Sequence, residues 1–383
     1  MNDRHPHSTR IAALAAASLI ALAACASDGE TADLPATTPA TTPDVTGEPD
    51  TGDDVLTPND TTHFGLTWFS PPPPDSAATV NERWVEATDA STVGRVMFDW
   101  IDVEPEAGDR RIAELDGALA EMVESGRAPM ASIVAVDVSG TEFPEWLGGF
   151  EPQRAADAYV AMVQDVLPVL ERHEVWTLAI ANEPPLADDD GLDRGDFATF
   201  VEEVVDQLQV IAPELPVTFT FAGGDPFIDD PAIDRMIDAV DVYSVNHYCL
   251  DAFLRALPLD EVAERIDEHV ERAGDLPIVF QEFGCPAGES MGASDEFQLA
   301  WFDAAFEHID DIDQVRAAYV FEFLDWSDET YELDYGSVDG VLADEIGQDF
   351  VDRFREWVLT SGLVRQDGTT RPAFDHFLDV AAG

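Results

Sequence analysis

Two short stretches decide how the chain folds: LAIANEP at residues 178–184 and IVFQEFG at residues 278–284. Each is a brief apolar run that ends in a glutamate, Glu183 in the first and Glu282 in the second. A run of this length and composition is typical of a buried strand. A carboxylate directly after a buried strand is costly unless it pairs with a cation or works in a site. Both stretches therefore predict a strand that delivers a functional group at its end.

Runs of the same kind recur along the chain, separated by amphipathic stretches of helical length, such as Glu114 to Glu124, Ala155 to Leu170, Phe197 to Ile211 and Asp260 to Arg272. Alternation of strands and helices predicts a parallel sheet, and eight strands favour a closed (β/α)8 TIM barrel over an open sheet. The eight predicted strands are Phe64 to Trp68, Gly94 to Phe98, Pro129 to Val136, Trp176 to Ala181, Val217 to Ala222, Val242 to Val245, Ile278 to Gln281 and Ala317 to Phe323.

In a closed barrel the functional groups gather at the carboxyl ends of the strands. Glu183 and Glu282 follow the fourth and seventh predicted strands, far apart in sequence, and a closed barrel can bring them together. The third and fifth strands end in Asp137 and Asp225 without a motif that matches. Glu322, on the eighth strand, is a third carboxylate near the same end and ranks behind the other two as a candidate.

The Asn-Glu-Pro of strand four and the Glu-Phe-Gly of strand seven, so placed, resemble the clan A glycoside hydrolases, a superfamily of retaining (β/α)8 enzymes. The resemblance spans the whole barrel. It is also carried by Arg95, Val103-Glu104-Pro105, Asn246-His247-Tyr248, Asp325-Trp326, and the closing stretch from Gly362-Leu363 to Arg371-Pro372-Ala373.

The resemblance implies a role for each matching residue. Glu183 would be the general acid and base, and Glu282 the nucleophile that forms a glycosyl-enzyme intermediate. Asn182 would contact the sugar 2-hydroxyl, Tyr248 would donate a hydrogen bond to the nucleophile, and His247 would lie beside it. For His247, a histidine buried in the upper barrel is the competing interpretation.

Three further side chains are candidates for the substrate-binding site. Arg95 would keep Glu282 ionised, or it would serve as a buried partner for another acidic residue of the barrel. Trp68 and Trp326, at the ends of strands one and eight, could stack on sugar rings, although most tryptophans belong to a core. The resemblance favours Trp326, because members of this superfamily often carry a subsite tryptophan after strand eight.

The N-terminus is typical of an exported lipoprotein. Arg4 and Arg10 precede an apolar run from Ile11 to Ala24, which as a helix would be about 21 Å long and too short to span a bilayer. Leu22-Ala23-Ala24-Cys25 resembles a lipobox, so residues 1–25 are predicted to be a signal peptide ending at a lipidated Cys25. The competing interpretation is an ordinary secretory signal with a chance cysteine.

Residues 26–62 are rich in Thr, Pro, Asp and Gly with almost no large apolar side chain, which predicts a disordered linker. Residues 63–383 follow as one catalytic barrel domain. The protein is therefore expected to lie outside the cytoplasm, held at the cell membrane through its lipid alone, and to act as a monomer.

The charge excludes whole classes of partner. The chain has 79 acidic and 19 basic residues, a formal net charge of −60, and every basic residue is arginine. Such a surface repels nucleic acid and anionic lipid head groups, so a neutral or cationic carbohydrate is the expected substrate. Adaptation to salt or simple solubility explains the acidity, and the fold is expected to gain stability in molar salt.

The absence of lysine excludes Schiff-base aldolases and pyridoxal enzymes. No closely spaced histidine pair suggests a transition metal, so neither a metal nor another cofactor is expected. Cys249 and Cys285 follow neighbouring strands and are either a disulfide bracing the nucleophile loop or two buried thiols.

These observations predict a retaining glycoside hydrolase acting on a β-linked oligo- or polysaccharide at the cell surface. A catalytically inactive carbohydrate-binding barrel lipoprotein is one alternative, against which the intact pair Glu183 and Glu282 argues. A transglycosylase, which passes the same intermediate to a sugar instead of water, is the other.

Overall fold

A computed structural model describes residues 62–69, 73, 75–137, 140–184, 192–336 and 339–382. The predicted signal peptide, Cys25 and almost all of the predicted linker lie outside the described residues. Thr62, the last residue of that linker, is already part of the fold, because its hydroxyl donates to the Ile309 carbonyl at 3.2 Å.

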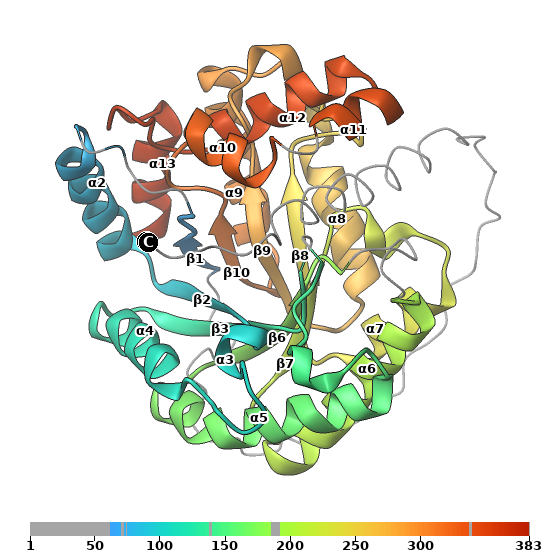
Figure 1. Cartoon of the computed structure of the whole chain (residues 1–383). Helices are drawn as coiled ribbons and strands as arrows, with labels where there is room; N and C mark the ends of the chain where they lie inside the picture. The colour runs from blue at the N-terminus through green and yellow to red at the C-terminus, as the bar shows by residue number, and fades with distance from the viewer. Residues whose placement is uncertain are drawn as a thin grey trace, which may run out of the picture.

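The chain folds into the predicted (β/α)8 barrel (Figure 1). Eight parallel strands form one sheet in the order β1-β10-β9-β8-β7-β6-β3-β2. At the seam between β1 and β2, the Thr92 N–H donates to the Phe64 carbonyl at 3.1 Å. The strands are β1 (His63–Leu66), β2 (Val93–Asp99), β3 (Ala128–Val134), β6 (Thr177–Asn182), β7 (Val217–Phe221), β8 (Tyr243–Tyr248), β9 (Ile278–Gly284) and β10 (Val315–Val320).

Helices surround the sheet, as Figure 1 shows. They cover the outward apolar face of the strands, which is why β6 and β9 are buried along their whole length. The helices outside the barrel are α2 (Ala77–Ala90), α3 (Trp100–Val103), α4 (Ile112–Glu124), α5 (Pro152–Arg172), α6 (Arg194–Ile211), α7 (Pro231–Ala239), α8 (Val262–Ala273), α9 (Asp295–Asp310) and α13 (Pro372–Ala381). No helix among the described residues is long and apolar enough to cross a membrane.

Two short additions lie near the carboxyl ends of the strands. Strands β4 (Val136–Asp137) and β5 (Gly140–Thr141) form a small antiparallel pair after β3. Helices α10 (Asp328–Asp334), α11 (Asp339–Glu345) and α12 (Gln348–Thr360) follow β10 and gather at the top of Figure 1.

The interior of the barrel is apolar at one end and polar at the other. The amino-terminal end is filled by a cluster of Val93, Met130, Ala179, Val242, Val279, Ala317 and Tyr319. Toward the carboxyl end, hydrogen-bonded polar side chains replace them; Thr220, for example, lies 2.9 Å from Ser244, oxygen to oxygen. The polar end is where an active site is expected in this fold.

Strands β8 and β9 each extend three residues beyond their predicted ends, at Val245 and Gln281. The prediction stopped where polar residues began. In the structure Asn246, Tyr248 and Glu282 continue the strands, because their side chains find hydrogen-bond partners inside the barrel. A polar residue therefore ended the predicted strand too early.

The closing stretch identified in the sequence is structural. Arg371 makes two hydrogen bonds to Asp325, at 2.7 and 2.9 Å, and the Gly362 N–H donates to the same carboxylate at 2.9 Å. Asp325 is thereby a buried, paired anion just after β10. This clamp fixes the chain that leaves the last strand.

Candidate active site

Glu183 follows β6 directly and adopts an unusual backbone conformation. Its φ is +43°, in the left-handed region that residues other than glycine rarely enter, and its N–H donates to the Thr220 carbonyl at 2.8 Å. The side chain accepts a hydrogen bond from Asn246 Nδ2 at 2.7 Å. Neighbouring strands thus hold both the backbone and the carboxyl of Glu183.

The surroundings of Glu183 favour its protonated form. Burial raises the pKa of the Glu183 carboxyl well above its ordinary value, and the nearby Glu282 raises it further. The hydrogen bond from Asn246 opposes this shift without reversing it. A buried carboxyl of this kind can donate a proton near neutral pH.

Glu282 lies on β9 and has different partners. The Tyr248 hydroxyl donates to its Oε2 at 2.5 Å, and Arg95 Nη1 lies 3.7 Å from its Oε1. Burial leaves the pKa of Glu282 above its ordinary value, but the Arg95 guanidinium and the Tyr248 hydroxyl both reduce that rise. Of the two carboxyls, Glu282 is therefore the one whose ionised form is supported by a cation and a hydroxyl donor.

Arg95 therefore lies beside Glu282, as the first of its two predicted roles requires. It is almost completely buried, with 2% of its side chain exposed, and its Nη2 also lies 2.7 Å from the Met97 sulfur.

Asn182 is the last residue of β6 and is held rigidly. Its Nδ2 donates to Asp137 at 2.9 Å, and its Oδ1 accepts from Gln281 Nε2 at 2.6 Å. Gln281 is held in turn by the Thr220 hydroxyl at 2.6 Å. This network fixes the amide of Asn182 next to Glu183.

The structure places His247 on the outward side of β8. Its Nδ1 lies 3.2 Å from His269 Nε2 of α8, and its ring stacks near Phe283 and Trp301. Burial, with a smaller contribution from Arg265, lowers the pKa of His247 to about 4, so the ring is neutral near pH 7. His247 does not join the Glu282–Tyr248 pair, but it does line a cavity that reaches Glu183.

The two candidate tryptophans have separate environments. Trp68 packs against Trp84 and Phe323 and, with Arg95, lines a cavity of about 390 Å³ on the β1–β2 side of the barrel. Trp326 donates from Nε1 to Glu322 at 2.7 Å and stacks on Tyr335.

Glu322 is fully buried, and burial raises its pKa well above the ordinary value. The indole N–H of Trp326 opposes that shift, whereas Asp325 and Glu282 add to it. Glu322 is therefore a neutral partner that holds Trp326, which is a positioning role.

A larger cavity of about 510 Å³ opens on the Glu183 side of the site. It is bounded by the ends of β6 and β8, the turn after β7, the loop after β8, and helices α8 and α12. Trp357 of α12 lies in its wall and packs edge-on against Tyr248, with ring centroids 5.2 Å apart.

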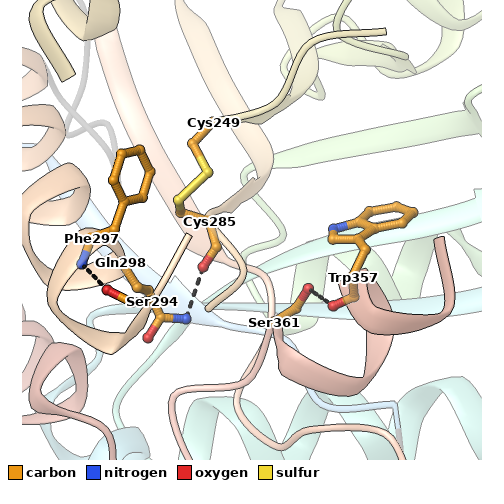
Figure 2. Close-up of a disulfide and its surroundings, with 7 residues drawn as sticks. All are labelled: Cys249, Cys285, Ser294, Phe297, Gln298, Trp357 and Ser361. Carbon is orange, nitrogen blue, oxygen red and sulfur yellow. Dashed lines mark hydrogen bonds between the residues drawn. A yellow bond between two sulfur atoms is a disulfide. The ribbon is translucent and has the colours of Figure 1, made fainter. Parts of the chain in front are cut away.

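Cys249 and Cys285 form a disulfide, which settles the two alternatives left open by the sequence (Figure 2). Their Cα atoms are 5.1 Å apart. Cys249 directly follows Tyr248, and Cys285 comes three residues after Glu282. Figure 2 also shows Gln298 donating to the Cys285 carbonyl, at 2.8 Å. The bridge thus ties together the ends of the two strands that carry the nucleophile candidate and its hydroxyl donor.

Sequence reasoning gave no role to three residues of the site: Asn246, Gln281 and Trp357. Asn246 could have been found from alternation along its strand, because residues two apart face the same side. Asn246 is two residues before Tyr248, and both face the interior. Gln281 could not be found from Glu282 in this way, because the two are adjacent and a register irregularity in β9 lets both face the interior. Trp357 comes from α12, outside the repeating units, and no motif marked it.

Within the described part of the chain, no group of three or more histidine, cysteine or acidic side chains is arranged to hold a metal ion.

Comparison with known proteins gives no family model that matches the chain and no curated protein that matches it. Solved structures do match. One is a GH5_18 protein from Bifidobacterium longum in complex with Manβ1-4GlcNAc, with a TM-score of 0.63 at 14% identity, covering 84% of this chain and 78% of that one. Another is the exo-β-1,4-mannosidase Op5Man5 from an Opitutaceae bacterium, with a TM-score of 0.59 at 14% identity, covering 84% and 59%.

A third match is a β-glucosidase, with a TM-score of 0.53 at 18% identity, covering 80% of this chain and 88% of that one. At these identities the similarity shows the fold, a (β/α)8 barrel. It does not by itself assign an activity.

Proposed function

We propose that this protein is a retaining glycoside hydrolase that acts on a β-linked sugar. The observation that carries the proposal is the contrast between two neighbouring buried carboxyls. Glu183 is held by an amide and pushed toward its protonated form, whereas Glu282 is held by Arg95 and Tyr248. Pairs of titratable groups with opposed environments are how such enzymes separate acid from nucleophile.

In the proposed reaction, a Glu282 oxygen attacks the anomeric carbon while the bond to the leaving oxygen breaks. Glu183 gives its proton to that oxygen. Glu183, now ionised, then takes a proton from water, whose oxygen attacks the same carbon and releases Glu282. Asn182, fixed by Asp137 and Gln281, would contact the sugar 2-hydroxyl beside the reacting bond.

The other candidate residues contribute to the proposed site in different ways. Arg95 and Tyr248 act through Glu282, and His247 belongs to the cavity on the Glu183 side. Trp68 and Trp326 would lie at the periphery of the substrate. Trp68 lines the β1–β2 cavity, and Trp326 is held by its hydrogen bond to Glu322.

A panel of purified β-glucan, β-mannan, xylan and galactan, with aryl β-mannosides and β-glucosides, tests the activity. Mannosides and glucosides come first because two solved neighbours are named as a mannosidase and a glucosidase. Proton NMR of the first product should show retained β-configuration. A first product of α-configuration would exclude a retaining enzyme.

We further propose that the protein is exported and anchored at the membrane by lipid on Cys25, as the sequence around Leu22 to Cys25 predicts. Mass spectrometry of the mature N-terminus tests this, and an unmodified N-terminus at another residue would refute it. The acidic composition supports the accompanying proposal that molar salt stabilises the fold, which a salt series of melting temperatures would check.

A further inference from the structure

The cavity of about 510 Å³ is placed asymmetrically with respect to the two carboxyls. Its described lining includes Glu183, Asn246 and Tyr248 at the barrel end, whereas Glu282 is not one of the described lining residues. From Glu183 it runs past β7 and β8 to α8. The space therefore adjoins the proton donor and leads away from the nucleophile.

Because the proposed reaction is a double displacement, this asymmetry indicates on which side the leaving group lies. The nucleophile and the leaving group occupy opposite sides of the anomeric carbon, and the acid must reach the leaving oxygen. A cavity that adjoins the acid but not the nucleophile is consequently on the side of the leaving group. The inference rests on the proposed function for this assignment of the two glutamates.

The walls of the cavity are mostly apolar. The turn after β7 supplies Gly223, which lies so close to β8 that a Cβ there would be 2.6 Å from the Asn246 carbonyl oxygen. Trp357 supplies aromatic surface of the kind that packs on the C–H face of a sugar ring. The remaining large apolar lining residues are Phe227, Leu250, Leu254 and Leu257.

The polar groups of the cavity offer no free positive charge. Arg265, the cation of the described lining, pairs with Glu268 at 3.2 Å and with Glu261 at 3.5 Å. Burial lowers the pKa of both His247 and His269, so both rings are neutral near pH 7. Both ring nitrogens of His269 are engaged, one with the Tyr243 hydroxyl at 3.0 Å and the other with His247 at 3.2 Å, so His247 is the ring that can exchange hydrogen bonds with a hydroxyl. An anion would meet acidic neighbours without a free counter-charge.

The geometry points to this cavity as the leaving-group site, and to a neutral sugar residue as the leaving group it accepts in preference to a uronic acid. Apolar walls match the C–H face of a neutral sugar, and the neutral His247 ring and the Tyr248 end match its hydroxyls. A uronate in the same place would bring a carboxylate beside Glu268 and Asp251.

The test compares substrates that share a glycone and differ in the leaving group. β-Glucosyl fluoride and β-mannosyl fluoride have a leaving group too small to use the cavity, whereas cellobiose and β-1,4-mannobiose must fill it. Ala252→Trp places an indole in the cavity wall. The ratio of kcat/KM for the disaccharide to kcat/KM for the fluoride should fall at least about tenfold. Ala78→Trp, at an exposed position on α2, is the matched control and should leave the ratio unchanged.

A second variant covers the case in which Ala252→Trp does not fold. Phe227→Ala removes a wall residue that is 46% exposed, so the fold should tolerate it, and the same ratio should fall. If Phe227→Ala leaves the ratio unchanged, or if disaccharide and fluoride lose activity equally in the folded variants, the cavity is not the leaving-group site.

A separate comparison tests the preference for a neutral leaving group. Wild-type enzyme should cleave cellobiose with a kcat/KM at least about tenfold above that for the disaccharide whose leaving residue is glucuronic acid. Equal values would overturn the preference for a neutral sugar. A wild-type protein that cleaves neither the fluorides nor the disaccharides would instead refute the proposed function, and this inference with it.

Discussion

The ends of β6 and β9 carry the same residue type in different surroundings. Glu183 leaves its strand with a positive φ and has an amide, Asn246, as its hydrogen-bond partner. Glu282 continues its strand, receives the Tyr248 hydroxyl, and faces Arg95. Both carboxyls are buried, so burial alone cannot distinguish them. Their neighbours do, and they make one carboxyl the better proton donor and the other the better anion.

The largest effect is expected at Glu282. Glu282→Ala removes the proposed nucleophile and should lower kcat on the order of 10⁶-fold, the size seen when another covalent nucleophile is removed. Added azide or formate should restore cleavage with inverted configuration, because the small anion then attacks in place of the carboxylate. Product configuration by NMR checks this.

Glu322→Ala is the comparison for that variant, since it also removes a buried carboxyl near the same strand ends. It should retain far more activity, because the hydrogen-bond partner of Glu322 is Trp326 and not the reacting sugar. If Glu322→Ala has the effect assigned to Glu282→Ala, the assignment of the nucleophile is wrong.

Glu183→Ala should lower kcat/KM by about 10² to 10⁴ on substrates with poor leaving groups. The loss should be small for a 2,4-dinitrophenyl glycoside, which departs without protonation. Its intermediate should then accumulate for want of a base, and azide should release it with retained configuration. A burst of dinitrophenol measures the first step. An equal loss on activated and natural substrates would contradict the role of Glu183 as the acid.

Tyr248→Phe tests the hydroxyl group that distinguishes the surroundings of Glu282 from those of Glu183. Burial and the neighbouring Glu282 raise the pKa of Tyr248 well above its usual value, so the phenol is a donor throughout the working range. Its removal should lower kcat/KM on the order of ten- to a hundred-fold, the strength of a hydrogen bond to a charged group.

The pH profile of Tyr248→Phe has a definite sign. Glu282 must be ionised to react, and the Tyr248 hydrogen bond lowers its pKa. Loss of the hydroxyl raises that pKa, so the acidic limb of the kcat/KM profile should move to higher pH. Tyr159→Phe is the control, because it removes a buried hydroxyl bonded to the Ile133 carbonyl, remote from both glutamates. An acidic limb that stays in place would show that Tyr248 does not tune Glu282.

The smallest effect on catalysis is expected from the disulfide. Cys249→Ser with Cys285→Ser should lower the free energy of unfolding by about 2–4 kcal/mol, because the unfolded chain regains the freedom of the closed loop. Since the bridge adjoins Tyr248 and follows Glu282, a modest shift of the acidic limb in the direction of Tyr248→Phe should accompany it. Thermal melts with and without reductant check the stability. If reductant leaves the melting temperature of the wild-type protein unchanged while both thiols become titratable, the bridge does not contribute to stability.

Much of this architecture was predictable from sequence, because a barrel is built by local repetition. All eight predicted strands are present, as are the helices expected between residues 114 and 272. The errors fell at strand ends. β8 and β9 run three residues past their predicted ends, because Asn246 and Glu282 are strand residues whose polarity made them look like loop. β1, β3 and β10 stop two or three residues before their predicted ends, which leaves Glu322 beyond β10 and not on it. Local patterns report burial against apolar neighbours. They do not report hydrogen bonds made across the barrel.

The sequence by itself determined the fold class, the two glutamates at strand ends and the acidic surface, since each depends on composition or on short-range periodicity. Only the tertiary structure decided which neighbours each glutamate has. Arg95, Asn246 and Trp357 come from three separate elements, and their distances to Glu282, Glu183 and Tyr248 depend on how the barrel closes. The joining of Cys249 to Cys285 and the outward placement of His247 were decided in the same way, because both depend on the register between β8 and β9.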